Sequence, residues 1–284
     1  MFSLLGKLLA AGYFSRPIFV VGAGRSGTTA LLHALGKHPK VLLVEREAPL
    51  LGHIGRLAYY IEPNEFREYY LENLMVPKEN IYYHLAKLLF ESCNGNNYGL
   101  QKSFNVMKNP GTKFFKKRCW VVKSFPTQEE FLGLRRLFPD SRYLYLVRNG
   151  INMVHSRTQF HGFKAHGFLD HCRTWTMNID QYSYIEKYPD VALEVRHELL
   201  VEDPQTIFTK ILKLIGIEQA IAPVDFISNN IIHPLDKPTQ YNVNVQDVIQ
   251  NRKPPWCEWT DEEREIFKSV CGENMNKFGY EIPF

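Results

Sequence analysis

The segment that most constrains this chain is a glycine-rich loop between a short apolar run and the start of a helix. The run from Ile18 to Val21 consists of β-branched and aromatic residues, which favour a buried strand. Gly22, Gly24 and Gly27 then allow the backbone to turn with positive φ, and the following helix presents unpaired N–H groups to an anion. The segment therefore predicts a strand, a tight loop and a helix that together bind a phosphorylated ligand.

Two nucleotide-binding patterns compete for this loop. The glycines spell G-x-G-x-x-G, and Glu45 ends a second apolar run, where a dinucleotide-binding fold has its ribose-binding acid. A FAD- or NAD(P)-dependent oxidoreductase is therefore one alternative. Gly22 and Gly27 also bracket four residues as in G-x-x-x-x-G-K-[ST], but Thr28 takes the place of the lysine. The missing lysine argues against an ATPase or kinase, whereas Arg25 offers a guanidinium fork for a terminal phosphate or sulfate.

Composition indicates an ordinary globular protein. The chain has 284 residues, 45% of them hydrophobic and 23% charged, so it can bury the core of one large α/β domain. The net charge is +4 at pH 7, and a cluster of lysines and one arginine between residues 108 and 118 favours a solvated loop over a nucleic-acid surface. No apolar run approaches the ~20 residues of a membrane span, so no membrane anchor is expected.

The cysteines and histidines predict neither a disulfide framework nor a metal site. Five cysteines are scattered without a C-x-x-C pair, which fits a reducing, cytoplasmic location. His161, His166 and His171 recur every five residues, a spacing unlike the i, i+4 pair of a zinc-binding helix. Residues 1–16 lack a clear signal-peptide cleavage site and are interpreted as a short packing helix.

Strand and helix patterns alternate along the chain. Strands are predicted at residues 18–21, 41–44, 119–122, 143–147 and 191–195, and helices at residues 28–35, 63–91, 127–137, 168–188, 204–215 and 261–278, with another helix beginning near residue 149. Such alternation is typical of an α/β fold with a central parallel sheet flanked by helices and with ligands at the carboxyl ends of the strands. Without a repeat or a linker, we expect one P-loop-type nucleotide-binding domain over residues 17–284.

A second basic element follows the strand predicted at residues 143–147. Arg148 comes directly after this strand, and Ser156 lies eight residues later on a predicted helix, so both side chains can face one anion. Taken alone, the pair is more simply interpreted as a surface charge and an ordinary helix hydroxyl. The glycine loop makes it a candidate for a second phosphate site.

Together, the two elements resemble the sulfotransferases that use 3′-phosphoadenosine 5′-phosphosulfate (PAPS). That family has a lysine-free glycine loop for the 5′-phosphosulfate and a strand-Arg-helix-Ser element for the 3′-phosphate. Residues 25–29, Arg-Ser-Gly-Thr-Thr, are similar to the first, and Arg148 with Ser156 is similar to the second, roughly 120 residues later. His38-Pro39 followed by Glu45-Arg-Glu47 resembles the tyrosylprotein and heparan-sulfate branches, and the chain as a whole is similar to a soluble bacterial relative of these branches.

The resemblance implies a role for each matching residue. The donor-binding residues are Gly24, Arg25, Ser26, Gly27, Thr28, Thr29, Arg148, Ser156, Arg252 and Lys253. Lys123 stabilises the leaving group, and Glu47 is the general base for the acceptor, with Glu45 as the competing carboxylate. No metal is required, and the product is adenosine 3′,5′-bisphosphate (PAP).

The sequence also departs from the family pattern. Phe125 replaces the histidine that the cytosolic branch carries after its third strand, so we expect no histidine base there, and Pro254 replaces the glycine after the late basic pair. Trp175, residues 194–204 and residues 278–280 resemble further family features. The favoured hypothesis is a PAPS-dependent sulfotransferase with a small-molecule acceptor, and the others are the oxidoreductase and an inactive nucleotide-binding relative. No motif specifies the acceptor or the oligomeric state.

Overall fold

The computed structural model of this chain describes residues 16–45, 50–61, 78–94, 117–163, 165–230 and 254–284. The packing helix predicted for residues 1–16 falls outside these ranges except for Arg16, and so does the first part of the helix predicted over residues 63–91. Three predicted site residues, Glu47, Arg252 and Lys253, also lie outside the described residues. Their roles remain predictions.

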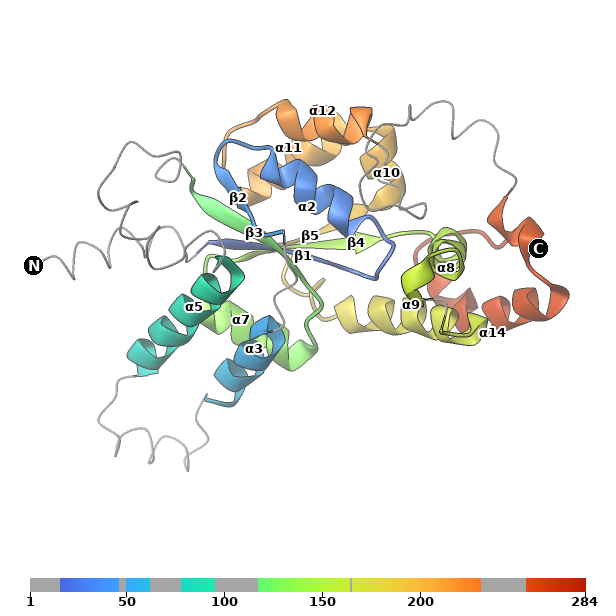
Figure 1. The fold of residues 1–284 in the computed structure, drawn as a ribbon, viewed down its shortest axis with the longest axis horizontal. Coiled ribbons are helices and arrows are strands. Elements are labelled where there is room, and N and C mark those ends of the chain that lie inside the picture. The colour runs from blue at the N-terminus through green and yellow to red at the C-terminus, as the bar shows by residue number, and fades with distance from the viewer. Residues whose placement is uncertain (1–15, 46–49, 62–77, 95–116, 164, 231–253) are drawn as a thin grey trace, which may run out of the picture. The chain divides into compact units, whose positions relative to one another are not determined.

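Five strands form one sheet in the order β2-β3-β1-β4-β5 (Figure 1). The strands are β1 (Pro17–Gly22), β2 (Val41–Leu43), β3 (Cys119–Ser124), β4 (Arg142–Val147) and β5 (Ala192–Arg196). β1 pairs in parallel with β3, from Pro17 opposite Trp120 to Val21 opposite Ser124, and β2 pairs in parallel with the other side of β3. All residues of β1 are buried, as expected for an apolar strand inside a parallel sheet. The predicted parallel α/β fold class is confirmed.

Helices connect the strands and also follow the last strand, β5. They are α2 (Thr28–Gly36), α3 (Leu50–Tyr60), α5 (Lys78–Asn94), α7 (Gln128–Leu137), α8 (Gly150–Thr158), α9 (Phe168–Tyr182), α10 (His197–Glu202), α11 (Pro204–Ile215), α12 (Ala222–Asn229) and α14 (Asp261–Lys277). Two short 3₁₀ turns, η2 (His161–Phe163) and η3 (Pro255–Glu258), precede α9 and α14. Each predicted helix that lies in the described ranges is present, although α9 ends six residues before the predicted Tyr188.

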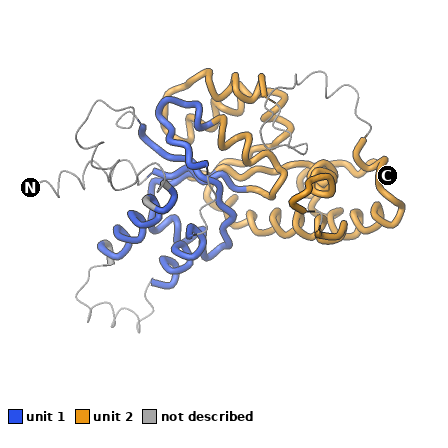
Figure 2. Tube along the Cα trace, viewed as in Figure 1, with its two compact units in different colours: residues 1–21, 35–143 blue, residues 22–34, 144–284 orange. Residues whose placement is uncertain are grey.

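Two compact units are distinguished by the contacts within the chain (Figure 2). The first unit comprises residues 1–21 and 35–143. Its core is aromatic: the ring of Tyr143 stacks on Phe19 at 5.1 Å between centroids and meets the edge of Phe131 at 4.7 Å. Helices α3, α5 and α7 lie beside one another in this unit, and β2, β3 and most of β1 belong to it.

The second unit comprises residues 22–34 and 144–284, and therefore contains both the glycine loop and the residues that follow β4. Helices α8, α9 and α14 pack together in it (Figure 1), with Trp175 and Met275 among the buried side chains between them. The two candidate phosphate elements therefore belong to the same compact unit, which is the feature of the fold that matters most for the site.

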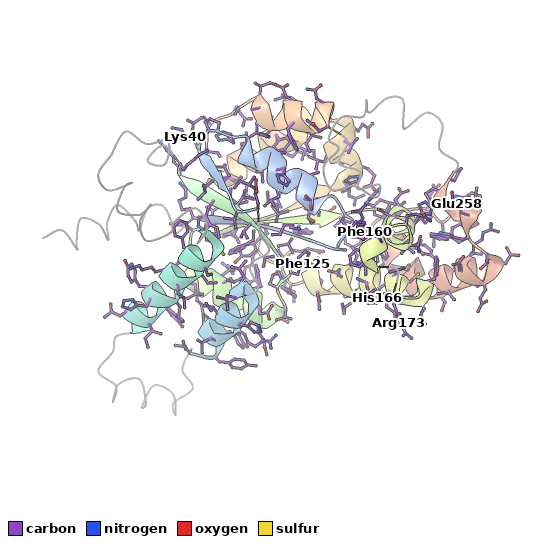
Figure 3. All side chains as sticks on the ribbon, in the orientation of Figure 1. Lys40, Phe125, Phe160, His166, Arg173 and Glu258 are labelled. Atoms are coloured by element: carbon purple, nitrogen blue, oxygen red, sulfur yellow. The ribbon has the colours of Figure 1, made fainter. Side chains whose placement is uncertain are left out.

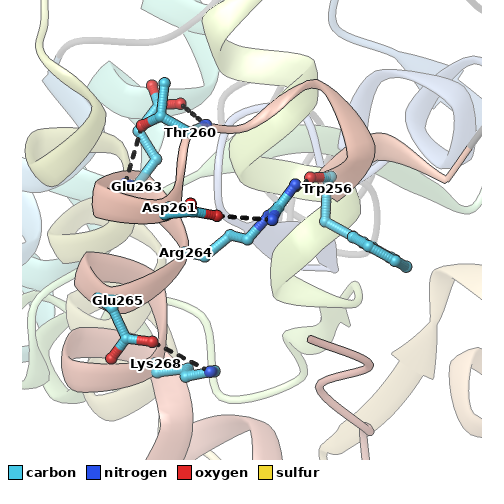
Figure 4. A network of polar contacts seen from close by, with 7 residues as sticks. All are labelled: Trp256, Thr260, Asp261, Glu263, Arg264, Glu265 and Lys268. Carbon is cyan, nitrogen blue, oxygen red and sulfur yellow. Dashed lines mark hydrogen bonds and ion pairs between the residues drawn. The ribbon is translucent and has the colours of Figure 1, made fainter.

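Local capping explains where α14 begins. Thr260 and Glu263 form a reciprocal capping box, in which each side chain accepts a hydrogen bond from the backbone N–H of the other residue (Figure 4). Exposed ion pairs Arg264–Asp261 and Lys268–Glu265 follow along the helix. Such surface pairs contribute at most about 1 kcal/mol each, so the cap and the buried face determine the start of the helix.

None of the helices in the described ranges combines the length and the apolar character that a membrane span requires.

Candidate functional site

The glycine loop between β1 and α2 has an unusual backbone. Gly22, Arg25 and Gly27 have φ values of 156°, 80° and 95°, all in the range that favours glycine. Arg25 is the one non-glycine residue in the described ranges with positive φ, a conformation that costs on the order of 1–3 kcal/mol. The Ser26 and Thr28 side chains are buried in the loop and at the start of α2. Positive-φ residues between a strand and a helix are typical of a loop whose backbone N–H groups bind an anion, although the N–H of Ser26 donates to the carbonyl oxygen of Ala23 at 3.1 Å.

Two of the loop glycines are approached closely by side chains of the same unit. A Cβ atom on Gly27 would lie 2.5 Å from Nδ1 of His197, the first residue of α10. A Cβ atom on Gly24 would lie 3.3 Å from Nη1 of Arg157 and 3.5 Å from the ring of Phe163. His197 and Arg157 therefore pack against the loop backbone, and sequence reasoning gave neither residue a role.

Gly27→Ala tests whether the loop geometry matters. The new methyl group meets the His197 ring, and alanine also has to adopt a φ of 95°, so we expect a loss of stability of about 1–3 kcal/mol from the backbone conformation and more from the collision. Chemical unfolding measures this loss. Gly272→Ala is the matched control, because Gly272 is helical and its Cβ would meet one atom at 4.0 Å, so this change stabilises or is neutral. Equal stability of the two variants would contradict the prediction.

Arg25 links the loop to α8. Its Nε donates a hydrogen bond to Oγ of Ser156 at 3.1 Å, and its guanidinium carbon lies 4.7 Å from the centroid of the Phe160 ring. Phe160, labelled in Figure 3, lies two residues beyond the end of α8. The Phe160 ring and the Ser156 hydroxyl fix the orientation of the Arg25 guanidinium. Arg25 and Ser156, which the sequence assigned to separate phosphate elements, are therefore in direct contact.

Arg148 joins the same cluster from the carboxyl end of β4. Its Nη1 donates a hydrogen bond to the backbone carbonyl oxygen of Arg25 at 2.6 Å, which supports the left-handed conformation of that residue. Arg25, Arg148 and Ser156 are thus held in one hydrogen-bonded group, and the assignment of Arg148 and Ser156 to one anion remains a prediction.

The turn that carries Arg148 is clamped by distant residues. Nε1 of Trp175 donates to the carbonyl oxygen of Arg148 at 3.0 Å, and the N–H of Asn149 donates to Oε1 of Glu198 at 2.9 Å. The hydroxyl of Tyr280 donates to the other oxygen of Glu198 at 3.0 Å. Asn149 itself caps α8 by accepting hydrogen bonds from two backbone N–H groups. These contacts give a structural reason for Trp175 and Tyr280, which the sequence singled out without a role.

Arg157 lies one residue beyond Ser156 and is only 6% exposed. Its Nε donates to Nδ1 of His171 at 3.2 Å, and its guanidinium carbon stands 4.0 Å from the centroid of the Phe163 ring. Because Nδ1 of His171 accepts this bond, the imidazole is neutral and carries its proton on Nε2. Ser156 and Arg157 point about 100° apart around a helix, so the sequence alone could not assign both to one site.

The cluster concentrates positive charge. Burial lowers the pKa of Arg25 from 12.5 to about 10, and the neighbouring charges of Arg148 and Arg157 act in the same direction. Burial also lowers the pKa of Arg157. Among the described residues, no carboxylate forms an ion pair with Arg25 or Arg157. A doubly charged anion at the loop would offset this repulsion.

The buried His171 predicts a pH dependence of stability. Burial lowers its pKa below 6.5, the charges of Arg157 and His166 lower it further, and Asp170 opposes them. As the pH falls below 6.5, the unfolded chain binds a proton that the native imidazole resists, so native stability decreases.

We therefore expect the unfolding temperature to fall between pH 7.5 and 5.5 more steeply in the wild-type protein than in His171→Phe, which has no imidazole to protonate. Calorimetry at each pH measures the two slopes. His161→Asn, at an exposed histidine, should keep the wild-type slope. Parallel slopes for the wild type and His171→Phe would contradict the prediction.

Lys123 and Glu45 lie in the first unit. Lys123 is the fifth residue of β3, pairs with Val20 and is partly exposed. Glu45 is exposed and follows β2. Both stand after the apolar part of a strand, as the sequence indicated, and their catalytic roles remain predictions. No group of three or more His, Cys, Asp or Glu residues in the described ranges is arranged to hold a metal ion.

Comparison with known proteins identifies the family. A model described as "Sulfotransferase family" matches residues 17–220, which include the glycine loop, Lys123, Arg148 and Ser156. The chain belongs to the sulfotransferase family. A curated relative, the protein-tyrosine sulfotransferase of Drosophila melanogaster, is 26% identical over 208 residues, which cover 70% of this chain. The chain spans 38% of the length of that relative.

Solved structures show the same fold. This sulfotransferase family member resembles the sulfotransferase domain of the Synechococcus PCC 7002 olefin synthase with a TM-score of 0.53 and 18% identity, covering 94% of this chain and 96% of that one. It resembles the sulfotransferase domain of the curacin biosynthetic pathway with a TM-score of 0.50 and 15% identity, covering 94% and 98%. No comparison supports an oxidoreductase, so the alternative raised by the G-x-G-x-x-G pattern is set aside.

Proposed function

We propose that this chain moves the sulfuryl group of PAPS to a hydroxyl or amine of an acceptor and releases PAP. The observation that carries the proposal is the hydrogen-bonded group formed by Arg25, Arg148 and Ser156 within one compact unit. In this group, the glycine loop and the strand-Arg-helix-Ser element meet, and each element was assigned to one phosphate of the donor. A family match over residues 17–220 supports the same reaction.

The residues of the second unit fit a ligand with two phosphate groups. The loop has three positive-φ residues, Arg157 and His197 pack closely against Gly24 and Gly27, and burial together with the charges of Arg148 and Arg157 lowers the pKa of Arg25. Backbone N–H groups of residues 24–29, the Thr28 and Thr29 hydroxyls and Arg25 would hold the 5′ end. Arg148 and Ser156 would hold the 3′-phosphate, with Arg252 and Lys253 as further candidates from the family resemblance.

When bound, PAPS supplies an activated sulfuryl group and a phosphate leaving group. The acceptor oxygen or nitrogen forms a bond to sulfur as the bond from sulfur to the bridging phosphate oxygen breaks, and the protein contributes positioning and electrostatics. We assign Glu47 to accept the proton of the acceptor and Lys123 to stabilise the charge on the leaving phosphate. This chemistry requires no metal.

A small molecule is the acceptor class that we propose. The net charge is only +4, and the basic excess gathers between residues 108 and 118, a distribution that does not indicate an extended basic surface for a glycan. All five cysteines have free thiols, which supports the proposed cytoplasmic location. The Drosophila relative is named for protein tyrosine, so a tyrosine-containing peptide is the comparison that an acceptor screen should include.

Calorimetric titration of the purified chain with PAP and with adenosine 5′-monophosphate (5′-AMP) tests the donor assignment. We expect PAP to bind in the micromolar range and 5′-AMP to bind at least about tenfold more weakly, because only PAP carries the 3′-phosphate. Equal binding of the two would contradict the role of Arg148 and Ser156. Mass spectrometry of small phenols, sugars and a tyrosine peptide incubated with PAPS then identifies the acceptor class, and bound PAP without any transfer would indicate an inactive relative.

A further inference from the structure

Arg157 is a buried cation whose environment is only partly explained by packing. Its Nε is used by His171, and one face of its guanidinium lies on the Phe163 ring. In the described part of the chain, its Nη atoms have no hydrogen-bond acceptor, and no carboxylate neutralises its charge. As a whole residue, Arg157 is only 6% exposed, so a negative partner or further acceptors would offset the desolvation of its charge.

The free edge of this guanidinium faces the glycine loop. Nη1 would lie 3.3 Å from a Cβ atom on Gly24, so the absence of a side chain there lets the cation approach the loop backbone. Arg157 also contributes to the lowered pKa of Arg25, which places both charges in one electrostatic field. The side chain is thus held by an aromatic face and an imidazole, and its Nη1 lies beside the backbone of Gly24.

We propose that Arg157 is a further anion-binding residue of the glycine loop and that His171 is its positioning residue. The Nη atoms donate to oxygens of a phosphate bound at the loop, while Nδ1 of His171 and the Phe163 ring fix the plane of the guanidinium. The ligand class is a phosphate or phosphosulfate ester. Its identity as the 5′ end of PAPS rests on the proposed function, whereas the anion site itself rests on the contacts of Arg157.

Titrations of Arg157→Gln with PAP and 5′-AMP test this proposal. Both ligands carry the 5′-phosphate, so we expect Arg157→Gln to lower the affinity for PAP and for 5′-AMP by a similar factor of about ten to a hundred. This is the usual effect of losing a charge-assisted hydrogen bond. Arg148→Ala should instead weaken PAP more than 5′-AMP. If folded Arg157→Gln binds both ligands as the wild type does, Arg157 is a packing residue and the proposal is wrong. If this variant does not fold, Arg157→Lys replaces it, because lysine keeps the charge but lacks the fork and should still weaken both ligands.

Substitutions of His171 separate positioning from packing. His171→Phe fills the space but removes the acceptor, so it should weaken PAP and 5′-AMP by nearly the same factor as Arg157→Gln. In His171→Asn, the amide oxygen can replace Nδ1 as an acceptor and should restore most of the affinity. Wild-type affinity in His171→Phe, or equal losses in both variants, would overturn the positioning role.

The same titrations distinguish this proposal from the proposed function. If the wild-type chain binds PAP and 5′-AMP equally but Arg157→Gln weakens both, the anion site is supported and the 3′-phosphate assignment fails. If the wild type prefers PAP but Arg157→Gln changes neither affinity, the proposed function is supported and the Arg157 proposal fails.

Discussion

Replacing Arg148 with alanine should weaken PAP binding by roughly 30-fold to several thousandfold. Removing one partner of a buried charge pair costs about 2–5 kcal/mol, which corresponds to roughly 30-fold to several thousandfold in affinity. The variant loses the guanidinium assigned to the 3′-phosphate and also the hydrogen bond of 2.6 Å that holds the backbone of Arg25. PAP should therefore lose more affinity than 5′-AMP, although both should weaken. Calorimetric titration of both ligands measures the two losses.

Arg173→Ala is the matched control for this variant. Arg173 is an exposed arginine on α9 in the same unit (Figure 3), so its loss removes a similar charge without touching the loop, and PAP binding should stay at the wild-type value. Thermal unfolding shows whether Arg148→Ala still folds. A folded Arg148→Ala protein that keeps the wild-type preference for PAP would refute the assignment of Arg148 to the 3′-phosphate.

Elements with local end signals could be predicted from the sequence. The helix α11 runs from Pro204 to Ile215 as predicted, because proline suits its first turn and Gly216 ends it in the left-handed conformation with a φ of 74°. The start of α7 follows from the capping box of Thr127 with Glu130. In these cases the signal is carried by residues within a few positions of the boundary.

The end of α9 could not be predicted in the same way. Apolar and aromatic residues continue in the sequence to Tyr188, so their spacing suggested that the helix continues too. The helix instead ends at Tyr182, and a series of turns carries Tyr184 and Ile185 back into the core. A continued helix and a series of turns can both bury these apolar residues, so hydrophobic spacing does not distinguish between the two.

The same distinction between local signals and long-range packing applies to the residues of the candidate site. The glycine loop, Arg148 and Ser156 could be proposed from the sequence, because the loop pattern and the strand-Arg-helix-Ser spacing are each carried by a short stretch of residues. Arg157 and His197 could not, because their roles come from side-chain approach to the loop, which depends on how α8 and α10 pack in the folded unit. The turn after β4 is held by hydrogen bonds from residues that are distant in the sequence. No spacing pattern in a single sequence predicts that Glu198 pairs with Tyr280.

Glu47→Gln should abolish most of the sulfuryl transfer while leaving the affinity for PAP unchanged. The glutamine side chain has nearly the same size but cannot accept the acceptor's proton, and loss of a general base lowers turnover by about 10²- to 10⁴-fold. Lys123→Ala should also lower turnover, because the charge that develops on the leaving phosphate loses a cation, an effect of about 10²- to 10³-fold by analogy with an oxyanion donor. Single-turnover transfer from PAPS at saturating acceptor measures both losses separately from binding.

The pattern of the carboxylate variants decides which residue is the base. Glu45 stands two positions before Glu47 in the sequence and is exposed, whereas a base that takes a proton near neutral pH needs a desolvated carboxylate. Turnover lost in Glu45→Gln and kept in Glu47→Gln would transfer the role to Glu45. Glu262→Gln, at an exposed position on α14, controls for the loss of one negative charge and should leave both turnover and PAP binding at wild-type values. If Glu47→Gln and Glu45→Gln both kept full turnover, a carboxylate base from this segment would be excluded, and the acceptor would have to lose its proton to another group or to water.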